Sequence, residues 1–447
     1  MSRLDVFKAY DVRGRTDNGE LDPDLFRAIG QGFVTLVEAG EIATGRDCRA
    51  SSLPLHDGLV AGITGSGADV VDLGEVPTDL VYFYSGSHSV PGAVITASHN
   101  PPQYNGLKLC RAGAAPVGAD TGLATIRELV ESGETTATDR VGKVRVVDAV
   151  EEYVDHLLSI VDPSTIGPMQ VVVDGGNGMA GVTVTRVFGR LAASLDGLYL
   201  DPDGSFPNHP ADPIQIENLA DLIAKVKRDR PDLGVAFDGD ADRAFFIDDQ
   251  GEPVSGSAVT ALIARWMLRR HPGATIIHNL ITSRAVPEII QETGGVPIRT
   301  RVGHSFIKQV MAESGAVFGG EHSGHYYFLE NYRADSGMLA MLILMRVLTE
   351  DGRPLSLLRQ DVERYQSSGE INLEVSDIQA ALARVEDEFD TVGIDRLDGL
   401  TIDRGNSWFN LRPSNTEPLL RLNVEGVDAA TVDETVERVR EVVEGAA

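Results

Sequence analysis

Short runs of β-branched and aliphatic residues alternate with longer amphipathic stretches along most of the chain, as strands alternate with helices. This alternation favours a parallel α/β architecture. Six strand-to-loop transitions stand out, in three consecutive pairs: 41–52 and 92–101, 170–181 and 233–243, 275–286 and 316–325. The loop of the second transition in each pair carries the candidate catalytic or binding residues that are described below. We therefore predict three doubly wound α/β modules, each with one reactive loop.

The pattern of predicted strands and helices changes after about residue 366. Segments 370–377, 407–414 and 419–426 have strand patterns there, and 376–390 and 429–444 have helical ones, so we predict a smaller α+β domain. The expected domains are 1–150, 151–252, 253–365 and 366–447. Ligands bind at the carboxyl ends of strands in open α/β sheets, so the three reactive loops are predicted to face one central cleft.

The formal net charge of −28 is unusual for an otherwise ordinary globular composition. It argues against a nucleic-acid partner, because phosphate backbones need a basic face. An acidic surface can aid solubility, and a salt-rich cytoplasm would also favour it. The longest apolar run, 338–345, is too short to cross a membrane and predicts a core helix.

The N-terminal residues carry charges throughout and lack the apolar core of a signal peptide, so we expect a cytoplasmic protein with no membrane partner. Cys48 and Cys110 are the only cysteines, too few for a disulfide framework or a cysteine metal site. The sequence leaves both a monomer and a dimer open.

The segment DGDADR at 238–243 carries three alternating aspartates. Along an extended loop, Asp238, Asp240 and Asp242 can converge on one hard cation such as Mg²⁺. A calcium EF-hand is the competing interpretation, but Arg243 stands where that loop needs glycine, and a strand pattern precedes it. A solvated acidic turn is the other alternative.

Ser98 and His99 follow a buried strand pattern in the segment AVITASHNPPQYNGLKL at 93–109. The context lacks the glycines of a hydrolase nucleophile elbow. In an extended segment, adjacent side chains point to opposite sides, so His99 is predicted to be badly placed as a base for Ser98. Asn105-Gly106 favours a tight turn that returns Lys108, one of only six lysines, to the vicinity of the serine.

The segment RPSNTEP at 412–418 lies between two strand patterns. The guanidinium, hydroxyl and amide groups there could bind a phosphate, with Asn415 tolerating a left-handed turn. The candidate residues are Arg412, Ser414, Asn415 and Thr416. An ordinary polar hairpin loop is the alternative.

Two further sets of residues are candidates for substrate contact. Glu321, Ser323 and His325 alternate in GEHSGH, a mixture of donors and acceptors that suits sugar hydroxyls; a zinc site is the alternative. His304 and Lys308 are four residues apart, so they share one face if a helix starts there. A catalytic role and a structural role for His304 remain equally open.

A dinucleotide-binding fingerprint is also present. Gly176, Gly178 and Gly181 follow a strand pattern, with Asp196 near the expected acidic position. A tight strand-to-helix turn explains the same glycines, so an NAD-dependent oxidoreductase is a remote alternative.

Five motifs occur in the order found in the α-D-phosphohexomutases, and the chain resembles that family over nearly its whole length. They are YDVRG (10–14), TASHNP (96–101), DGDADR (238–243), GEHSGH (320–325) and RPSNTEP (412–418). The resemblance implies three α/β modules, a smaller C-terminal domain and a phosphosugar substrate. It also implies interconversion of hexose 1-phosphate and hexose 6-phosphate through a 1,6-bisphosphate, which also primes the serine.

The resemblance also implies roles for individual residues. Ser98 would be phosphorylated and would complete the Mg²⁺ shell formed by the three aspartates. The implied catalytic residues are Ser98, Lys108, Arg243 and His304. The implied substrate-binding residues are Tyr10, Arg13, His99, Lys308, Glu321, Ser323, His325, Arg412, Ser414, Asn415 and Thr416. Some family members carry a lysine in the loop corresponding to 279–284, which has none here, so its role would pass to His304 or Lys308.

The motifs GEHSGHYYF (320–328) and YRADSGML (332–339) most resemble the phosphomannomutase and phosphoglucomutase branch, so mannose and glucose phosphates are the expected substrates. Phosphoglucosamine mutase is the alternative within the family. A phosphosugar-binding protein without activity would keep the 412–418 loop but lose Ser98 or the aspartates, all of which are present.

Overall fold

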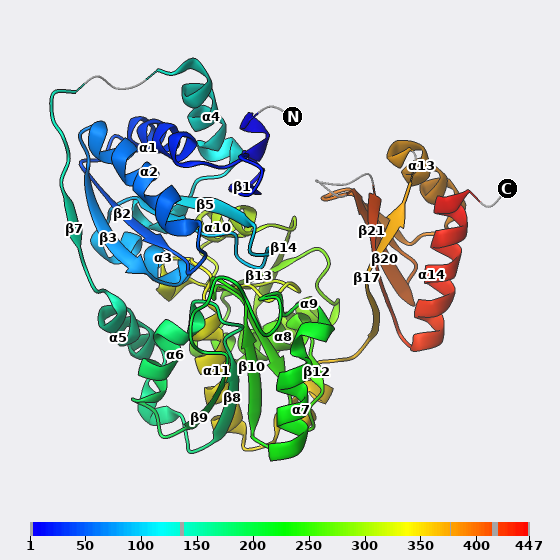
Figure 1. Ribbon diagram of the computed structural model, residues 1–447. Coiled ribbons are helices and arrows are strands. Elements are labelled where there is room, and N and C mark those ends of the chain that lie inside the picture. The colour runs from blue at the N-terminus through cyan, green and yellow to red at the C-terminus, as the bar shows by residue number, and fades with distance from the viewer. Residues whose placement is uncertain (1–2, 135–137, 376, 414–418, 446–447) are drawn as a thin grey trace.

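The computed structural model describes residues 3–134, 138–375, 377–413 and 419–445, which form four sheets with helices packed around them (Figure 1). The predicted residues Ser414, Asn415 and Thr416 lie outside the described residues. No helix in the described part of the chain has both the length and the apolar character of a membrane span.

The first three sheets share one strand order, which explains the recurring sequence pattern. In each, a first strand pairs in parallel with its two neighbours, and one neighbour pairs antiparallel with the next strand along the chain. In the first module the order is β3 (Asp69–Glu75), β2 (Glu41–Arg46), β4 (Gly92–Ile95), β5 (Tyr104–Arg111). The second has β9 (Ser194–Leu198), β8 (Gln170–Asp174), β10 (Leu233–Phe237), β11 (Ala244–Ile247). The third has β14 (Val296–Thr300), β13 (Thr275–Asn279), β15 (Phe318–Gly320), β16 (Tyr326–Phe328).

Edge strands and helices complete these modules. The additional strands, each at an edge of its sheet, are β1 (Val12–Arg15), β6 (Ala115–Pro116), β7 (Val144–Val146) and β12 (Pro253–Val254). The helices of the first module are α1 (Pro23–Val37), α2 (Ser52–Gly65), α3 (Thr78–His88) and α4 (Leu123–Ser132). Those that follow are α5 (Val150–Ile160), α6 (Ala180–Phe188), α7 (Ala220–Asp229), α8 (Gly256–Arg270), α9 (Ala285–Glu292), α10 (His304–Ser314), α11 (Gly337–Asp351) and α12 (Leu355–Leu358).

Helix α11 confirms the core helix expected at 338–345. Ser336 caps its N-terminus by accepting a hydrogen bond from the backbone N–H of Leu339 at 3.1 Å. The residues from Met338 to Met345 are all buried, as expected for a helix that is apolar on every face. They belong to one buried apolar cluster that includes residues of all three modules, so these modules share a core.

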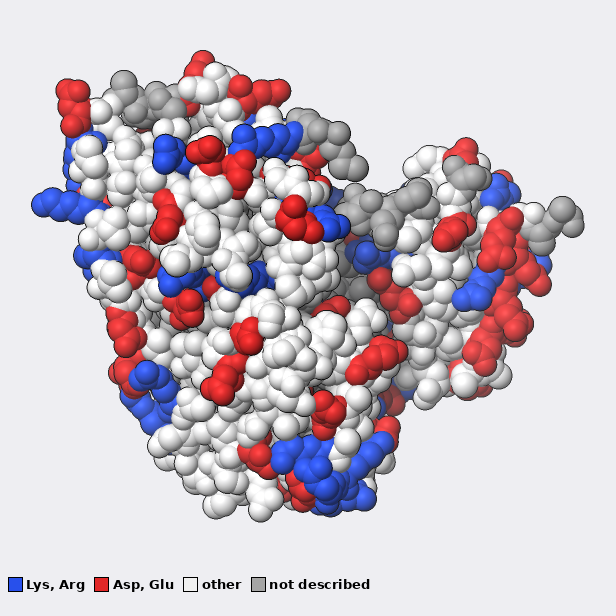
Figure 2. All heavy atoms as spheres, in the orientation of Figure 1, with Lys and Arg blue, Asp and Glu red and all other residues white. Residues whose placement is uncertain are grey.

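The C-terminal sheet is antiparallel, with the order β17 (Gln366–Glu374), β21 (Leu419–Gly426), β20 (Ser407–Pro413), β19 (Leu400–Asp403), β18 (Gly393–Asp395). Helices α13 (Ile378–Glu388) and α14 (Ala429–Glu444) pack against it and form a separate buried core. Figure 2 shows acidic side chains gathered over the outer side of this domain, where α14 lies in Figure 1. The predicted α/β modules and smaller α+β domain are therefore confirmed.

The prediction of a tight turn at Asn105-Gly106 is wrong. Both residues lie inside β5, and the chain turns earlier, where the N–H of Tyr104 donates to the carbonyl of Pro101 at 3.0 Å. Gly106 is needed for close packing, because a Cβ there would lie 2.3 Å from the carbonyl oxygen of Val12. The strand nevertheless carries Lys108 into the interior.

Candidate active site

Ser98 lies in the loop after β4, in a left-handed conformation with φ of 51°. Its hydroxyl donates to Asp238 Oδ2 at 2.7 Å and lies 3.2 Å from Nδ1 of His99. The expectation that His99 points away from Ser98 is therefore wrong. It assumed an extended backbone, and the left-handed turn brings the two side chains to the same side.

Two arginines donate hydrogen bonds to backbone carbonyls of the serine loop, defined as residues 97–100. The buried guanidinium of Arg49 donates to the carbonyls of Ser98 at 2.7 Å and Asn100 at 2.6 Å, and it pairs with Asp47 at 3.0 Å. Arg13 donates to the carbonyl of Ala97 at 2.8 Å. Since both side chains bind main-chain oxygens, the loop conformation is fixed by groups outside the loop.

The three aspartates follow β10, as the sequence pattern predicts. Asp238, Asp240 and Asp242 are all at most 2% exposed, and one ligand oxygen from each lies within 4.8 Å of the others. The metal loop, defined as 238–242, also packs directly on the serine loop. A Cβ at Gly239 would lie 2.4 Å from the carbonyl oxygen of Ser98, so only glycine fits there.

Two buried cations balance these carboxylates. Lys108 Nζ lies 2.6 Å from Asp240 Oδ2 and also pairs with Asp242. Arg243 Nε donates to Asp238 Oδ2 at 2.9 Å. Lys108 therefore contacts the metal loop, and none of its hydrogen bonds reaches Ser98 itself.

Burial and these charges separate the acidities of the aspartates. Burial raises the pKa of Asp238 to about 8, against the opposing charge of Arg243. Burial also disfavours the charged form of Asp240, but the Lys108 ammonium outweighs it and holds the pKa of Asp240 below its usual range. The pKa of Lys108 is raised well above its usual value, because Asp240 and Asp242 together outweigh the effect of its burial.

The donor set fits a hard cation. The Oδ1 atoms of Asp240 and Asp242 are buried, and neither has a hydrogen-bond partner among the described residues. Buried carboxylate oxygens without donors are costly unless a cation lies nearby. The preceding element is the strand β10, so the leading helix of an EF-hand is missing here.

The candidate sugar-binding loop follows β15, and its carboxylate is held in place within the third module. Glu321 is 2% exposed and accepts hydrogen bonds from the hydroxyl of Tyr327 at 2.6 Å and from Nδ2 of Asn279 at 3.0 Å. Ser323 Oγ lies 3.2 Å from Nδ1 of His325. The predicted set of three is therefore brought together beside Tyr327.

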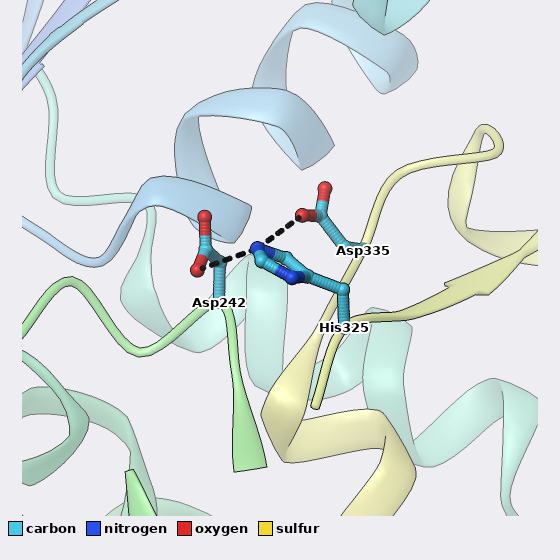
Figure 3. A group of neighbouring side chains, drawn as sticks. All are labelled: Asp242, His325 and Asp335. Atoms are coloured by element: carbon cyan, nitrogen blue, oxygen red, sulfur yellow. Dashed lines mark ion pairs between the residues drawn. The ribbon is translucent and has the colours of Figure 1, made fainter. Parts of the chain in front are cut away.

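His325 links this loop to the metal loop. Figure 3 shows its imidazole between Asp242 and Asp335, with Nε2 at 3.6 Å and 3.8 Å from their carboxylate oxygens. Lys308 Nζ lies 2.7 Å from the other oxygen of Asp335 and 3.9 Å from the centre of the Tyr82 ring. A continuous series of ionisable side chains therefore runs from Lys308 through Asp335 and His325 to Asp242.

The remaining predicted residues lie around this centre. Tyr10 donates to the carbonyl of Val302 at 3.2 Å. Burial raises the pKa of Tyr10, and the charges of Glu321 and Arg412 also affect it. Arg412 is the penultimate residue of β20 and pairs with Glu370 at 3.3 Å. His304 begins α10, so it and Lys308 are one helical turn apart, as predicted.

Sequence reasoning missed several residues that position the site. Thr78 donates its hydroxyl to Asp240 Oδ2 at 2.7 Å, and its neighbour Asp79 is 1% exposed. Arg49 and Asp335 were also missed. A Pro-Thr-Asp helix start at 77–79 was the only local signal. Thr78 contacts Asp240 in another module, and Arg49 donates to the carbonyl of Ser98, 49 positions away. Asp335 pairs with Lys308 and His325, which belong to other elements of its own module.

The glycines of the dinucleotide fingerprint have packing roles. A Cβ at Gly178 would lie 2.6 Å from the carbonyl oxygen of Gly239, and one at Gly181 would lie 1.6 Å from that of Leu200. Asp196 pairs with Lys225 at 2.6 Å. The turn after β8 therefore needs these glycines to support the metal loop.

Comparisons with known proteins agree with this arrangement. Models of the phosphoglucomutase/phosphomannomutase family match the chain in four parts: alpha/beta/alpha domain I at residues 4–137, domain II at 151–251, domain III at 255–365 and the C-terminal domain at 370–442. Phosphohexose mutases of Xanthomonas campestris pv. campestris are 39% identical over 447 residues, covering 99% of this chain and 100% of the relative.

A phosphomannomutase of Escherichia coli is 37% identical over 452 residues, covering 98% of this chain and 99% of the relative. The crystal structure of a phosphoglucomutase/phosphomannomutase family protein from Burkholderia thailandensis superposes with a TM-score of 0.91 at 32% identity, covering 100% of this chain and 99% of that one. The chain belongs to the phosphoglucomutase/phosphomannomutase family of metal-dependent phosphohexomutases. It is therefore an enzyme, and its buried aspartates can bind a metal.

Proposed function

We propose that this enzyme interconverts the 1-phosphate and 6-phosphate of mannose and of glucose through a phosphoserine at Ser98. The observation that carries the proposal is the contact between the Ser98 hydroxyl and Asp238, 2.7 Å apart, at the edge of three converging aspartates. A phosphoryl group on Ser98 would meet a cation bound there. The names of the relatives support the same reaction class.

Mg²⁺ is the proposed metal, held by Asp238, Asp240, Asp242 and the phosphorylated Ser98. The all-oxygen, carboxylate-rich donor set suits it. When bound, it would neutralise charge on the transferring phosphoryl group. Lys108 and Arg243 are buried cations on the same carboxylates, so they can stabilise negative charge that develops at Ser98 Oγ.

The proposed cycle has two transfers. The bond between Ser98 Oγ and phosphorus breaks, and a bond forms from phosphorus to the free hydroxyl of the hexose monophosphate. The proton of that hydroxyl is lost and, in the net reaction, replaces the phosphoryl group on Ser98 Oγ, so the serine is left as a hydroxyl. The resulting 1,6-bisphosphate rebinds in the opposite orientation and returns its other phosphoryl group to Ser98. The same bisphosphate primes a serine that has lost its phosphate.

Substrate binding is assigned to residues on either side of this centre. Glu321 and Ser323 are proposed to hold the 3- and 4-hydroxyls. Tyr10, Arg13, His99, Lys308 and His325 are proposed as further substrate-binding residues, and His304 as a catalytic one. Arg412, with the loop 414–416, is proposed to bind the phosphate that is not transferred. Because the sugar binds in two orientations, the site must use hydroxyls that occupy similar places in both.

Steady-state kinetics on mannose 1-phosphate and glucose 1-phosphate test the sugar assignment. The two sugars differ only at the 2-hydroxyl, so we expect specificity constants within roughly tenfold, or about 1.4 kcal/mol. Glu321→Ala should lower both together, and Tyr327→Phe, which removes one partner of Glu321, should have a smaller effect on both. Turnover of glucosamine 1-phosphate alone, or a Glu321→Ala effect on one sugar only, would contradict the assignment.

A further inference from the structure

A cavity of about 490 Å³ lies between the first module and α10 of the third. One wall comes from the chain after β5, at 111–121, and the other from α10 and the Tyr332-Arg333 turn. Ser98 and the metal loop are not among the residues that line it. The cavity therefore lies beside the proposed reacting centre, and it shares Tyr10 and Lys308 with the proposed substrate-binding residues.

The cavity is basic in an otherwise acidic chain. Arg111, Arg301 and Arg333 line it, and Asp120 is the one acidic residue among the described residues of the wall. Arg111 donates only to carbonyls, those of Leu36 and Thr121, and Arg301 lies over the ring of Phe306 at 4.4 Å. Within the described chain no carboxylate pairs with any of these three guanidinium groups.

Other arginines of the third module are compensated, as Arg299 is by Asp395 and Arg284 by Asp403. The chain has 67 acidic and 39 basic residues, so carboxylate partners are plentiful. Three arginines that share a cavity without such a partner leave a local positive charge that favours an anion.

Arg333 is held at the wall by a strained turn. Tyr332 and Arg333 are consecutive left-handed residues, with φ of 56° and 62°. Such conformations persist in non-glycine residues only where the surrounding structure imposes them. Here the Tyr332 ring packs on Gly86, where a Cβ would lie 2.2 Å from the ring, and it stacks on His156 at 5.5 Å. The packing of Tyr332 therefore keeps the backbone that carries Arg333 in this left-handed conformation.

Ala114, Ala115, Pro116, Ala312 and the Phe306 ring give the cavity an apolar part, while Thr121, Ser305 and Gln309 are uncharged polar residues of the wall. Arginine forks bind phosphate oxygens in pairs, and apolar walls exclude water from the remainder of a ligand. We propose that this cavity is a second anion site, which binds a small phosphate ester with an apolar or aromatic body. The binding claim does not depend on the proposed function.

The ligand would also affect turnover, and this part rests on the proposed function. Lys308 lines the inner end of the cavity, and its ammonium pairs with Asp335, which in turn faces His325 beside Asp242. A phosphate in the cavity attracts that ammonium and so perturbs the charges next to the metal loop. The site is therefore placed to regulate the enzyme through Lys308, which is also one of the proposed substrate-binding residues.

Isothermal titration with phenyl phosphate, which has a phosphate and an aromatic body, tests binding. We expect Arg333→Gln to weaken binding at least tenfold, and Ala312→Glu, which introduces a carboxylate at the wall, to do the same. Arg127→Gln, on the exposed face of α4, and Arg412→Gln should leave it within twofold. Inorganic phosphate should bind more weakly than phenyl phosphate.

Several results would contradict the proposed second anion site. Absence of binding to the wild type would do so, as would equal affinity in the Arg333→Gln and Ala312→Glu variants when both have wild-type melting temperatures. Equal loss in Arg412→Gln would place the ligand in the substrate cleft instead. Kinetics separate the two proposals: phenyl phosphate should change kcat at least twofold in the wild type and not in Arg333→Gln. If the wild-type protein binds phenyl phosphate at Arg333 but turns over no hexose phosphate, the proposed function is refuted and the anion site is not.

Discussion

The first three modules and the C-terminal domain differ in how they are held together. The modules share one buried apolar cluster, and their reactive loops contact one another through buried charges. The C-terminal domain has its own core and meets the third module through polar contacts such as Arg284 with Asp403 at 3.2 Å. In Figure 1 it stands apart from the other three.

This difference corresponds to two functions, the placement of the reacting groups and the binding of the phosphate that is not transferred. Groups that must be placed precisely relative to one another, such as Ser98 and Asp238, are buried between modules with a common core. The residue proposed to bind the distant phosphate, Arg412, belongs to a unit that folds around its own core and docks by partly exposed ion pairs, which contribute little stability. Substitutions in the two regions should therefore have different consequences.

The largest effect is expected at the metal loop. Asp240→Asn removes a charge from a buried site that the cation, Lys108 and Thr78 all share, so we expect kcat/KM to fall at least about 1000-fold, or about 4 kcal/mol. Titration with Mg²⁺ after chelation should show weaker metal binding. The exposed Asp201→Asn is the control, and equal activity of the two variants at low Mg²⁺ would contradict the site.

The second effect concerns the junction of the three modules. Asp79 on α3 accepts hydrogen bonds from Ser336 Oγ at 2.7 Å and from Tyr153, and no Lys or Arg in the described part of the chain pairs with it. Burial raises the pKa of Asp79 to about 7, and the charges of Asp242 and Asp335 add to this. The group is therefore protonated in the folded protein at pH values where the unfolded chain has lost the proton.

Its contribution to stability follows from that shift. The unfolded pKa is near 3.9, so the contribution is complete below about pH 4 and is lost as the pH rises through about 7. Relative to Asp79→Asn, the wild-type free energy of unfolding should fall by up to about 4 kcal/mol between about pH 4 and pH 8. Denaturant unfolding across this range, with the exposed Asp120→Asn as control, measures the difference. A constant difference would contradict the prediction.

A smaller effect is expected in the C-terminal domain. Arg412→Ala removes a charge-assisted hydrogen bond worth about 2 kcal/mol, so KM should rise about 30-fold with kcat changed much less. Arg421 stands opposite Arg412 in the sheet and pairs with the same Glu370 at 3.3 Å, so Arg421→Ala is the matched control. If both substitutions raise KM equally, Arg412 has no special contact with the substrate.

The same comparison shows what the sequence could predict. Strand-to-loop transitions are local patterns, and the predicted strands ending near Ile95, Phe237 and Gly320 all form. The three aspartates could be placed together because alternation along one loop brings them to one side. The recurrence of three modules was also visible, since each repeats the same succession of strand-to-loop transitions.

What could not be predicted depends on distant parts of the chain. The left-handed turn at Ser98 is imposed by Arg49 and by Gly239, far apart in sequence, and it reverses the expected orientation of His99. Asn105-Gly106 is typical of a turn, but antiparallel pairing with Gly14 and Arg13 of β1 keeps both residues in a strand. Asp335 gave no local signal, because its partners Lys308 and His325 come from other elements.

The most direct test of the account is whether the phosphate is on Ser98. Intact-mass and peptide mapping of the purified enzyme, after incubation with a hexose 1,6-bisphosphate and Mg²⁺, should show one phosphate on the peptide that contains Ser98. Ser98→Ala should lack both the phosphate and mutase turnover, while Ser87→Ala, on the exposed end of α3, should retain both. Full turnover by Ser98→Ala, or a phosphate located on another residue, would contradict the phosphoserine mechanism.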